Sequence, residues 1–330
     1  MSNGRARAYT NIALIKYWGK KDQALILPMN NSLSLTLDAF YTETSVILDP
    51  KLIQDEFFLD GIQQSEQATA KVSRFLDLVR TKVGNQSFVR VTSQNFVPTA
   101  AGLASSASGL AALAGASASA FGLDLKATEL SRLARRGSGS ACRSIYGGFA
   151  EWQQGHDDES SFAVPIASAD WENELSMLFV VVNDQQKDVS SRAGMQRTVE
   201  TSAFYPGWLD SVPKDLAQAK HAIAQKDFTA LGEVTERSAL KMHGTTLAAV
   251  PPFTYWSPES VQAMQLVRTL RNEGLACYFT MDAGPNVKVL VQRKDEQQLL
   301  AKFAEVFHHS QLLMAHAGPG LEILTKEGSL

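Results

Sequence analysis

The spacing of apolar and polar residues predicts a chain that mixes strands with helices. Residues 44–48 and 88–92 are rich in β-branched and apolar side chains, which is typical of strands. Between them, apolar residues recur every three or four positions, as on the buried face of a helix: Val72, Phe75, Leu76, Val79 and Val83. The first part of the chain therefore reads as strand, helix, strand.

A long segment of small residues follows at 98–121 and consists mainly of Ala, Ser and Gly. Flexible linkers share this composition, but Leu103, Leu110, Leu113 and Phe121 favour a buried element. A helix without a charged face is a buried helix, and small side chains would let it pack close to its neighbours. We therefore expect a helix in tight contact with the rest of the fold.

The second half predicts a further unit of strands and helices. The apolar run at 177–182 suits a buried strand. The elements predicted after it are a helix carrying Val261, Met264, Val267 and Leu270, strands at 276–280 and 287–291, a helix near 299–307 and a last strand at 321–324. This order fits a split β-α-β-β-α-β unit of the ferredoxin-like kind.

The domain organisation follows from length and from the lack of linkers. A chain of 330 residues can bury one large core or two smaller ones. The sequence contains no internal repeat and no Pro/Gly/Ser-rich linker long enough to separate independent domains. We expect two lobes that share a cleft, with residues 1–184 in the N-terminal lobe and residues 185–330 in the C-terminal lobe.

Composition and charge narrow the kinds of ligand. Hydrophobic residues make up 45% and charged residues 20% of the chain, which excludes disordered and fibrous classes. Lys and Arg total 31 against 34 Asp and Glu, so the net charge is −3 and no overall positive field attracts nucleic acid or an anionic membrane. An anionic ligand must therefore be held by a local cluster of cations.

The sequence shows no sign of export, of a membrane span or of a metal cage. Charged residues interrupt the first thirty residues, and no run of roughly twenty apolar residues occurs. Cys142 and Cys277 have no CxxC spacing, and the six histidines show no zinc-ligand spacing. We expect a cytoplasmic protein in which Cys142 is a packing residue.

A glycine- and serine-rich loop is the first candidate for chemistry. Residues 98–109 read PTAAGLASSASG and place Gly102, Ser105 and Ser106 at the head of the small-residue helix. The first N–H groups of a helix lack intrahelical partners and favour an anion, so this loop could hold phosphate. No lysine follows the glycine, which excludes a P-loop of the GxxxxGK[ST] kind. The alternative is a close helix–sheet contact without a ligand.

Four segments together point to a known family. The loop resembles the phosphate-binding motif of the GHMP kinase superfamily, Pro-x-x-x-Gly-Leu-x-Ser-Ser-x-Ala. Residues 9–20 read YTNIALIKYWGK, residues 138–144 read SGSACRS, and residues 281–288 read MDAGPNVK. In this order the four segments resemble those of the diphosphomevalonate decarboxylases. The resemblance spans almost the whole chain, although residues 210–228 carry no motif.

The resemblance implies both a fold and a reaction. The implied fold is the α+β GHMP kinase fold, in which an N-terminal lobe like domain 2 of ribosomal protein S5 and a C-terminal ferredoxin-like lobe surround a deep active-site cleft. The implied reaction is the ATP-dependent decarboxylation of mevalonate 5-diphosphate to isopentenyl diphosphate through phosphorylation of its 3-hydroxyl. It also implies ATP and Mg²⁺ as cofactors, and a homodimer that binds neither nucleic acid nor a membrane.

The resemblance also assigns the residues of the reaction. Asp282 resembles the catalytic aspartate, although an aspartate at such a turn most often caps its own backbone. Asn11 and Arg143 would hold the substrate carboxylate, because a guanidinium fork matches a carboxylate. Lys16 and Arg143 would keep Asp282 ionised if they lie nearby. Lys187 lies in a segment that could close over the nucleotide.

The remaining assignments concern phosphate groups. For the diphosphate of the substrate the family pattern points to Tyr17, Lys20, Ser138, Gly139, Ser140, Arg143, Ser191 and Arg192. For the nucleotide it points to Ser93, Ala101, Gly102, Leu103, Ala104, Ser105 and Ser106, with Ser106 as the Mg²⁺ ligand. Lys20 could instead belong to a solvated charge run beside Lys21, and Ser191 and Arg192 could simply begin a surface helix.

Two other functions stay open at this point. One is a different GHMP enzyme, such as a phosphomevalonate decarboxylase or a mevalonate-type kinase. The other is a non-catalytic nucleotide-sensing protein, since a fold does not dictate its function. The presence of Asp282, Arg143 and Asn11 together argues against the sensing protein.

Overall fold

The computed structural model describes residues 3–96, 106–182 and 188–324. Its strands are β1 (Asn3–Ile15), β2 (Lys20–Asp22), β3 (Leu27–Pro28), β4 (Ser32–Leu48), β5 (Glu56–Leu59), β6 (Ile62–Gln63), β7 (Val89–Phe96), β8 (Phe149–Trp152), β9 (Ala163–Pro165), β10 (Leu175–Val180), β11 (Cys277–Met281), β12 (Val287–Gln292), β13 (Leu312–His316) and β14 (Glu322–Ile323). Its α-helices are α1 (Glu66–Val83), α2 (Ser106–Ala120), α3 (Ala127–Gly137), α4 (Ser191–Thr201), α5 (Tyr205–Gln225), α6 (Phe228–Leu247), α7 (Pro258–Asn272) and α8 (Glu296–Ala304). Short 3₁₀ helices are η1 (Gly139–Ile145), η2 (Trp171–Glu174), η3 (Arg293–Asp295) and η4 (His309–Gln311).

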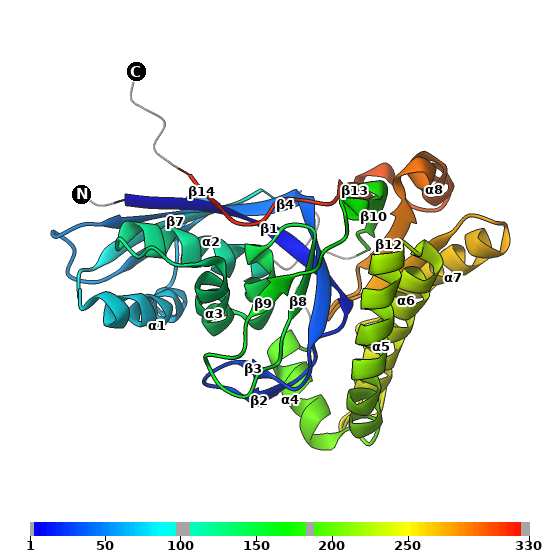
Figure 1. Ribbon diagram of the computed structural model, residues 1–330, viewed down its shortest axis with the longest axis horizontal. Coiled ribbons are helices and arrows are strands. Elements are labelled where there is room, and N and C mark those ends of the chain that lie inside the picture. Colours follow the sequence, from blue (N-terminus) through cyan, green and yellow to red (C-terminus); the bar gives the residue numbers. More distant parts are fainter. Residues whose placement is uncertain (1–2, 97–105, 183–187, 325–330) are drawn as a thin grey trace.

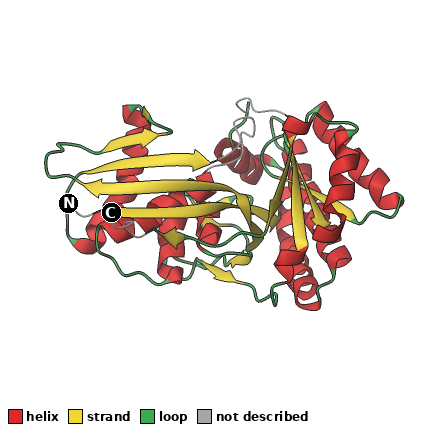
Figure 2. Cartoon of the chain, turned by 90° about the horizontal axis from the view of Figure 1, so that it is seen from above, coloured by secondary structure: helices red, strands yellow, loops and turns green. Residues whose placement is uncertain are grey.

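The first sheet forms the N-terminal lobe and is covered by helices on one face. Its strand order is β14-β1-β4-β7-β5-β6, with β8 paired to β4 and β9 paired to β8. Helices α1, α2 and α3 lie on the same side of its long strands (Figure 1), which run side by side in Figure 2. The predicted strand at 44–48 lies within β4, and the predicted strand at 88–92 overlaps β7 from Val89 onward. The predicted helix between them is α1, so these elements are confirmed.

Helix α2 packs against β1 at very short range, as its small residues predict. A Cβ atom added at Gly4 of β1 would lie 2.1 Å from the carbonyl oxygen of Ala116. The α2 residues Ala111, Ala112 and Ala114 are fully buried. Larger side chains would push the helix away from the sheet, so the small residues are needed for this packing.

The second sheet has the predicted ferredoxin-like topology. Its strand order is β11-β12-β10-β13, and all three pairings are antiparallel. Alternate residues of β10 face opposite sides, as in any strand: Leu178 and Val180 pack with α7 and α8, whereas Met177 and Phe179 pack toward α5, α6 and the first sheet. Because both faces are covered, the strand reads in the sequence as a continuous apolar run.

The prediction for the closing strand of this unit is wrong. Residues 321–324 were expected to complete the second sheet, but β14 pairs with β1 in the first sheet. The closing strand is β13, which pairs with β10. The run Leu312–His316 is short and does not alternate between apolar and polar residues, so it lacks the pattern by which a strand is recognised.

The two lobes share one hydrophobic core. Phe40 of β4 and Phe179 of β10 meet edge to face, with ring centroids 4.7 Å apart, and a single cluster of buried side chains joins strands of both sheets. The division at residues 184 and 185 stays a prediction, and the pairing of β10 within the second sheet favours a boundary before Leu175. In the described ranges, no helix has the length and apolar character needed to cross a membrane.

Candidate active site

A cavity of about 370 Å³ lies where the two lobes meet, between the end of β1, η1, the start of α4 and the turn after β11. Its described lining carries five cationic side chains and one carboxylate: Lys16, Lys20, Arg143, Arg192, Lys288 and Asp282. This local excess of positive charge contrasts with the net charge of −3 of the chain. The cavity is therefore suited to a ligand with several negative charges.

Asp282 lies at the entrance of the turn between β11 and β12, and its carboxylate is held by two lysines. Oδ1 accepts a hydrogen bond from Lys16 Nζ at 2.8 Å, and Oδ2 lies 3.3 Å from Lys288 Nζ. The turn itself is closed by the backbone, through Gly284 N to the Asp282 carbonyl oxygen at 2.8 Å. The carboxylate is thus directed at side chains of the cavity, as the functional interpretation requires.

The two ammonium groups keep Asp282 ionised. Burial by itself would raise the pKa of Asp282, but Lys16 and then Lys288 outweigh it and hold the pKa well below its usual range. The Asp282 side chain nevertheless keeps 38% of its surface exposed. An ionised carboxylate therefore faces the cavity.

Lys16 follows the last residue of β1 and is almost completely buried, with 2% of its side chain exposed. Its Nζ also donates to the Ala13 carbonyl oxygen at 2.8 Å. Burial lowers the pKa of Lys16 to about 8, against the opposing effect of the Asp282 carboxylate. The proximity of Lys16 to Asp282 that we expected is present in the structure.

Arg143 and Asn11 lie together in the lining of the same cavity. Arg143 is 2% exposed, and it donates from Nε to Asn11 Oδ1 at 3.2 Å and from Nη1 to Ser32 Oγ at 2.6 Å. Both partners are neutral, so the guanidinium charge is left for an anionic ligand. A register shift in β1 between Tyr9 and Asn11 changes the direction of the Asn11 side chain, which donates to the Ser140 carbonyl oxygen at 3.0 Å.

The residues assigned to the substrate diphosphate line the same cavity: Tyr17, Lys20, Ser138, Gly139, Ser140, Ser191 and Arg192. Lys20 is half-buried, and burial together with the Arg192 charge lowers its pKa. It therefore differs from the exposed Lys21 beside it. The hydroxyl of Tyr17 is buried and makes no hydrogen bond within the described part of the chain, so it could still donate to a phosphate oxygen.

Glycine is required where the chain turns between Tyr17 and Lys20. Gly19 has a φ of +102°, which is a left-handed conformation, and a Cβ there would lie 2.1 Å from the hydroxyl oxygen of Tyr205. Tyr205 in turn donates to the Trp18 carbonyl oxygen at 2.7 Å. The turn is therefore fixed against α5, and it holds Tyr17 and Lys20 on one side of the cavity.

Two helices begin at the cavity, and the N–H groups of their first turns could bind phosphate there. Ser106 is the first residue of α2, and Ser191 is the first residue of α4. The N–H groups of a first helical turn are free to bind anions, and the helix dipole adds to the attraction. The alternative that Ser191 and Arg192 begin a surface helix is therefore compatible with a role in the site.

One described residue of the predicted set is not part of the cavity lining, and others lie outside the described residues. Ser93 is on β7, where its hydroxyl is bonded to Thr44 Oγ1 at 2.8 Å, and it is not part of the described lining. Lys187 and the loop residues Ala101, Gly102, Leu103, Ala104 and Ser105 lie outside the described residues. Cys142 is fully buried, and burial raises its pKa to about 12, which agrees with a packing role.

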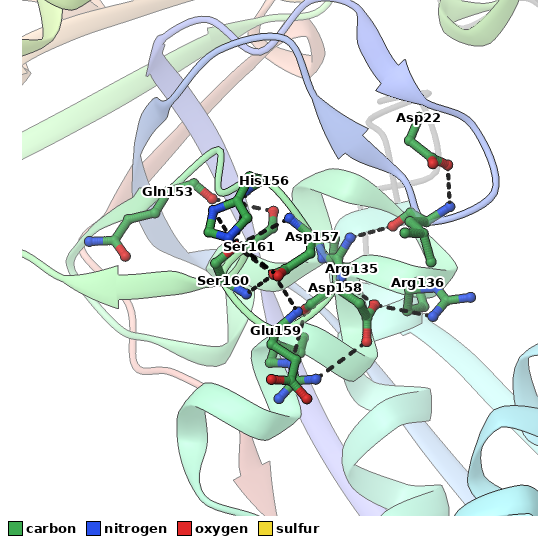
Figure 3. Close-up of polar contacts among 12 residues, drawn as sticks. Asp22, Arg135, Arg136, Gln153, His156, Asp157, Asp158, Glu159, Ser160 and Ser161 are labelled. Atoms are coloured by element: carbon green, nitrogen blue, oxygen red, sulfur yellow. Dashed lines mark hydrogen bonds and ion pairs between the residues drawn. The ribbon is translucent and has the colours of Figure 1, made fainter.

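Three arginines of α3, the helix that ends just before Ser138, form ion pairs with one carboxylate. Arg132, Arg135 and Arg136 of α3 lie within 3.3, 2.6 and 3.1 Å of Asp158, and Figure 3 shows Arg135 and Arg136 directed at this carboxylate. Arg135 also donates to the Leu25 carbonyl oxygen. The cluster thus ties the end of α3 to the β2–β3 hairpin. Both elements carry cavity residues, because Ser138 to Ser140 come directly after α3 and Lys20 is the first residue of β2.

The sequence analysis missed several residues that support the site. Lys288 could have been found, because a lysine inside the apolar strand VKVLV is unusual. Ser32, Ser238 and Asn30 had no such signal: Ser32 binds Arg143, Ser238 Oγ accepts from Lys16 N at 3.1 Å, and Asn30 Nδ2 donates to the Lys16 carbonyl oxygen at 2.8 Å. Serine and asparagine are common everywhere, and their partners lie far away in the sequence.

Two family models match most of the chain. The family model described as diphosphomevalonate decarboxylase-like N-terminal domain matches residues 8–163, and the model described as mevalonate 5-diphosphate decarboxylase C-terminal domain matches residues 177–321. The diphosphomevalonate decarboxylase of Bos taurus is 38% identical over 323 residues, which cover 92% of this chain and 79% of the relative.

Solved structures are similar along almost the whole chain. The mevalonate diphosphate decarboxylase from Enterococcus faecalis is 63% identical, with a TM-score of 0.94 and 98% of each chain covered. A structure described as MDDEF in complex with MVAPP, AMPPCP and magnesium is 64% identical, with a TM-score of 0.95 and 98% of each chain covered. The predicted α+β GHMP kinase fold is thereby confirmed. Since family models match both lobes and a curated relative aligns along most of its length, the chain belongs to the diphosphomevalonate decarboxylase family.

Proposed function

We propose that this chain converts (R)-mevalonate 5-diphosphate, with ATP, to isopentenyl diphosphate, ADP, phosphate and CO₂. The observation that carries the proposal is the cavity itself, whose described lining combines five cations with a single ionised carboxylate. The substrate brings a carboxylate and a diphosphate, and the nucleotide brings a triphosphate. A protein with a net charge of −3 needs such a local cluster to bind them together.

Arg143 and Asn11 are proposed to hold the substrate carboxylate. Arg143 offers a planar fork whose charge is not neutralised by a hydrogen-bonded carboxylate, and Asn11 adds a neutral group. A stronger set of ion pairs would stabilise the carboxylate before the reaction and oppose the release of CO₂. One buried cation with neutral neighbours is a suitable compromise.

The phosphate groups are proposed to bind in the same cavity. Tyr17, Lys20, Ser138, Gly139, Ser140, Ser191 and Arg192 would hold the substrate diphosphate. The start of α2 would hold the nucleotide phosphates, with Ser106 as a Mg²⁺ ligand. Within the ranges that the structure describes, no group of three or more His, Cys, Asp or Glu side chains is arranged to hold a metal ion. Phosphate and water would therefore supply most of the ligands of Mg²⁺, which supplies charge neutralisation during phosphoryl transfer.

Asp282 is proposed to orient the 3-hydroxyl and to receive its proton. The low pKa of Asp282 makes it a weak base, but phosphoryl transfer has a loose transition state in which little covalent work is left to the protein. The proton needs to leave only late, once the oxygen has begun to bind phosphorus. Correct placement of an ionised carboxylate is therefore more important here than its basicity.

The pKa of Lys16 predicts a loss of activity at alkaline pH. Burial lowers this pKa to about 8, so the free protein loses the Lys16 ammonium above that pH. Because kcat/KM reports groups of the free enzyme, we expect it to fall about tenfold per pH unit above pH 8. In Lys16→Arg, whose guanidinium keeps its proton, the alkaline limb is expected beyond pH 9. An unchanged limb in that variant would show that another group is responsible.

Product analysis tests the proposed function. Purified protein with ATP, Mg²⁺ and mevalonate 5-diphosphate is expected to release ADP and CO₂ in equal amounts and to form isopentenyl diphosphate. Parallel assays with mevalonate and mevalonate 5-phosphate separate the other GHMP activities. Release of ADP without CO₂ would mean that the chain is a kinase. A preference for the monophosphate would identify mevalonate 5-phosphate as the substrate.

Three further features remain proposals that rest on the family resemblance. Lys187 would neutralise phosphoryl charge near the nucleotide, and the protein would act as a cytoplasmic homodimer. Light scattering during gel filtration tests the dimer, for which a mass near twice the 35.9 kDa of one chain is expected.

A further inference from the structure

Lys288 is a buried lysine in the middle of the second sheet. It is the second residue of β12, which lies between β11 and β10, and it is 5% exposed. Its neighbours Val287 and Val289 face α7 and α8, so Lys288 faces the opposite side, toward the cavity. A buried ammonium is costly unless a partner compensates for its lost hydration, so its position calls for an explanation.

Among the described residues, the side-chain partners of Lys288 belong to the turn that carries Asp282. Nζ lies 3.3 Å from Asp282 Oδ2 and donates to the Asn286 carbonyl oxygen at 3.2 Å. The other carboxylate oxygen, Oδ1, is bound by Lys16 at 2.8 Å. Lys16 comes from the N-terminal lobe and Lys288 from the C-terminal lobe, so the two oxygens of one carboxylate are held from opposite sides.

Two cations on different oxygens can fix the orientation of a carboxylate plane, which a single cation cannot do. The terminal torsion of an aspartate is broad and roughly two-fold, so a single ion pair leaves the carboxylate plane free to turn. With Lys16 on Oδ1 and Lys288 on Oδ2, rotation would break one of the two ion pairs. The orientation of a reacting group within a small tolerance decides much of a rate enhancement.

We propose that Lys288 is a positioning residue that fixes the plane of the Asp282 carboxylate against the substrate hydroxyl. This inference rests on the proposed function of Asp282. It assigns to Lys288 no contact with the reacting atoms, and it explains why a strand that is otherwise apolar carries a lysine at this point.

Kinetics of two variants test the proposal. In Lys288→Met, which keeps the length of the side chain but not its charge, kcat is expected to fall by about 10- to 100-fold while KM for both substrates stays within about threefold. Lys288→Arg keeps the charge and is expected to recover most of the loss. The control is Lys302→Met on α8, which removes a surface lysine that pairs with Glu305 and should leave kcat unchanged.

The pH profile separates loss of the Lys288 charge from a packing defect. The charge of Lys288 lowers the pKa of Lys16, as does Arg143 from η1. The pKa of His243, which faces the same group from α6, is lowered to about 3, so His243 stays neutral in the assay range. In Lys288→Met the alkaline limb of kcat/KM should therefore move above that of the wild-type protein, whereas Lys288→Arg should keep it.

A crystal structure of ligand-free Lys288→Met supplies a readout that does not depend on activity. The Asp282 carboxylate is expected to occupy a new or a second orientation. The proposal is overturned if the carboxylate keeps its single wild-type orientation, if kcat stays within about twofold of wild type, or if both variants lose activity equally with an unchanged alkaline limb. If the wild-type protein released no CO₂, the proposed function would fail, and the crystal structure would still decide the role of Lys288.

Discussion

Asp282→Asn is expected to lower kcat by about 10²- to 10⁴-fold, which is the usual range for the loss of a proton-accepting side chain. Asparagine has the same shape and can keep one hydrogen bond to Lys16, but it cannot carry the charge that faces the substrate hydroxyl. We propose that the nucleotide phosphates bind at the start of α2 and not at Asp282, so the dissociation constant of the nucleotide should stay within about threefold. Single-turnover kinetics and nucleotide titration measure the two quantities separately.

Asp282→Asn also removes the negative charge that two buried ammonium groups share. Without Asp282 the ammonium groups of Lys16 and Lys288 lie close together without a carboxylate between them. Part of the loss could therefore come from a shift of the turn. A thermal melt and Asp282→Ala serve as controls, and a parallel loss of nucleotide binding and turnover in both variants would identify Asp282 as a structural turn residue.

Arg143→Lys is expected to lower kcat/KM by about 10²-fold or more, although the charge is conserved. The guanidinium donates to Asn11 and Ser32 through two different nitrogens and still has donors left for a ligand. A lysine has one nitrogen, so it cannot reach both neighbours and the substrate carboxylate. Each hydrogen bond to a charged group contributes about 1.5–3 kcal/mol, and the loss of even one would reduce kcat/KM by at least tenfold.

The control for Arg143→Lys is the same substitution at an arginine that does not line the cavity. Arg90 on β7 pairs with Glu56 and keeps 46% of its side chain exposed, so Arg90→Lys should have no effect on turnover. Steady-state kinetics with varied mevalonate 5-diphosphate measure both variants. If Arg143→Lys turned over at nearly the normal rate, Arg143 would not be the group that holds the carboxylate.

Much of the fold followed from local patterns. The apolar spacing in α1 and the continuous apolar run of β10 were recognised because helical and buried-strand patterns are strong over such lengths. The small residues of α2 correctly indicated close packing against β1. The pattern failed at β13 and β14, because the pairing of a short strand depends on which sheet edge lies beside it and not on its own residues.

The residues of the candidate site, too, could be predicted from the sequence only in part. Residues Asn11, Lys16, Arg143 and Asp282 stand in motifs that resemble a known family, and the structure brings them to one cavity. Ser32 and Ser238 could not be found in this way, since nothing in their surroundings distinguishes them from other serines. The role of Ser93 at the nucleotide stays a prediction, and its hydroxyl is hydrogen-bonded to Thr44 within the first sheet.

The sequence by itself determined the family, the reaction that the family implies and the residue types available for it, because these depend on short motifs whose order along the chain is enough. Only the tertiary structure decided that Lys16 and Lys288, 272 positions apart, bind the two oxygens of one carboxylate. The physical reason is that an ion pair depends on distance in space, and the packing of β1 against the second lobe sets this distance. The lowered pKa of Asp282 and the place of its charge in the cavity, and with them the chemistry that we propose, are thus properties of the folded chain.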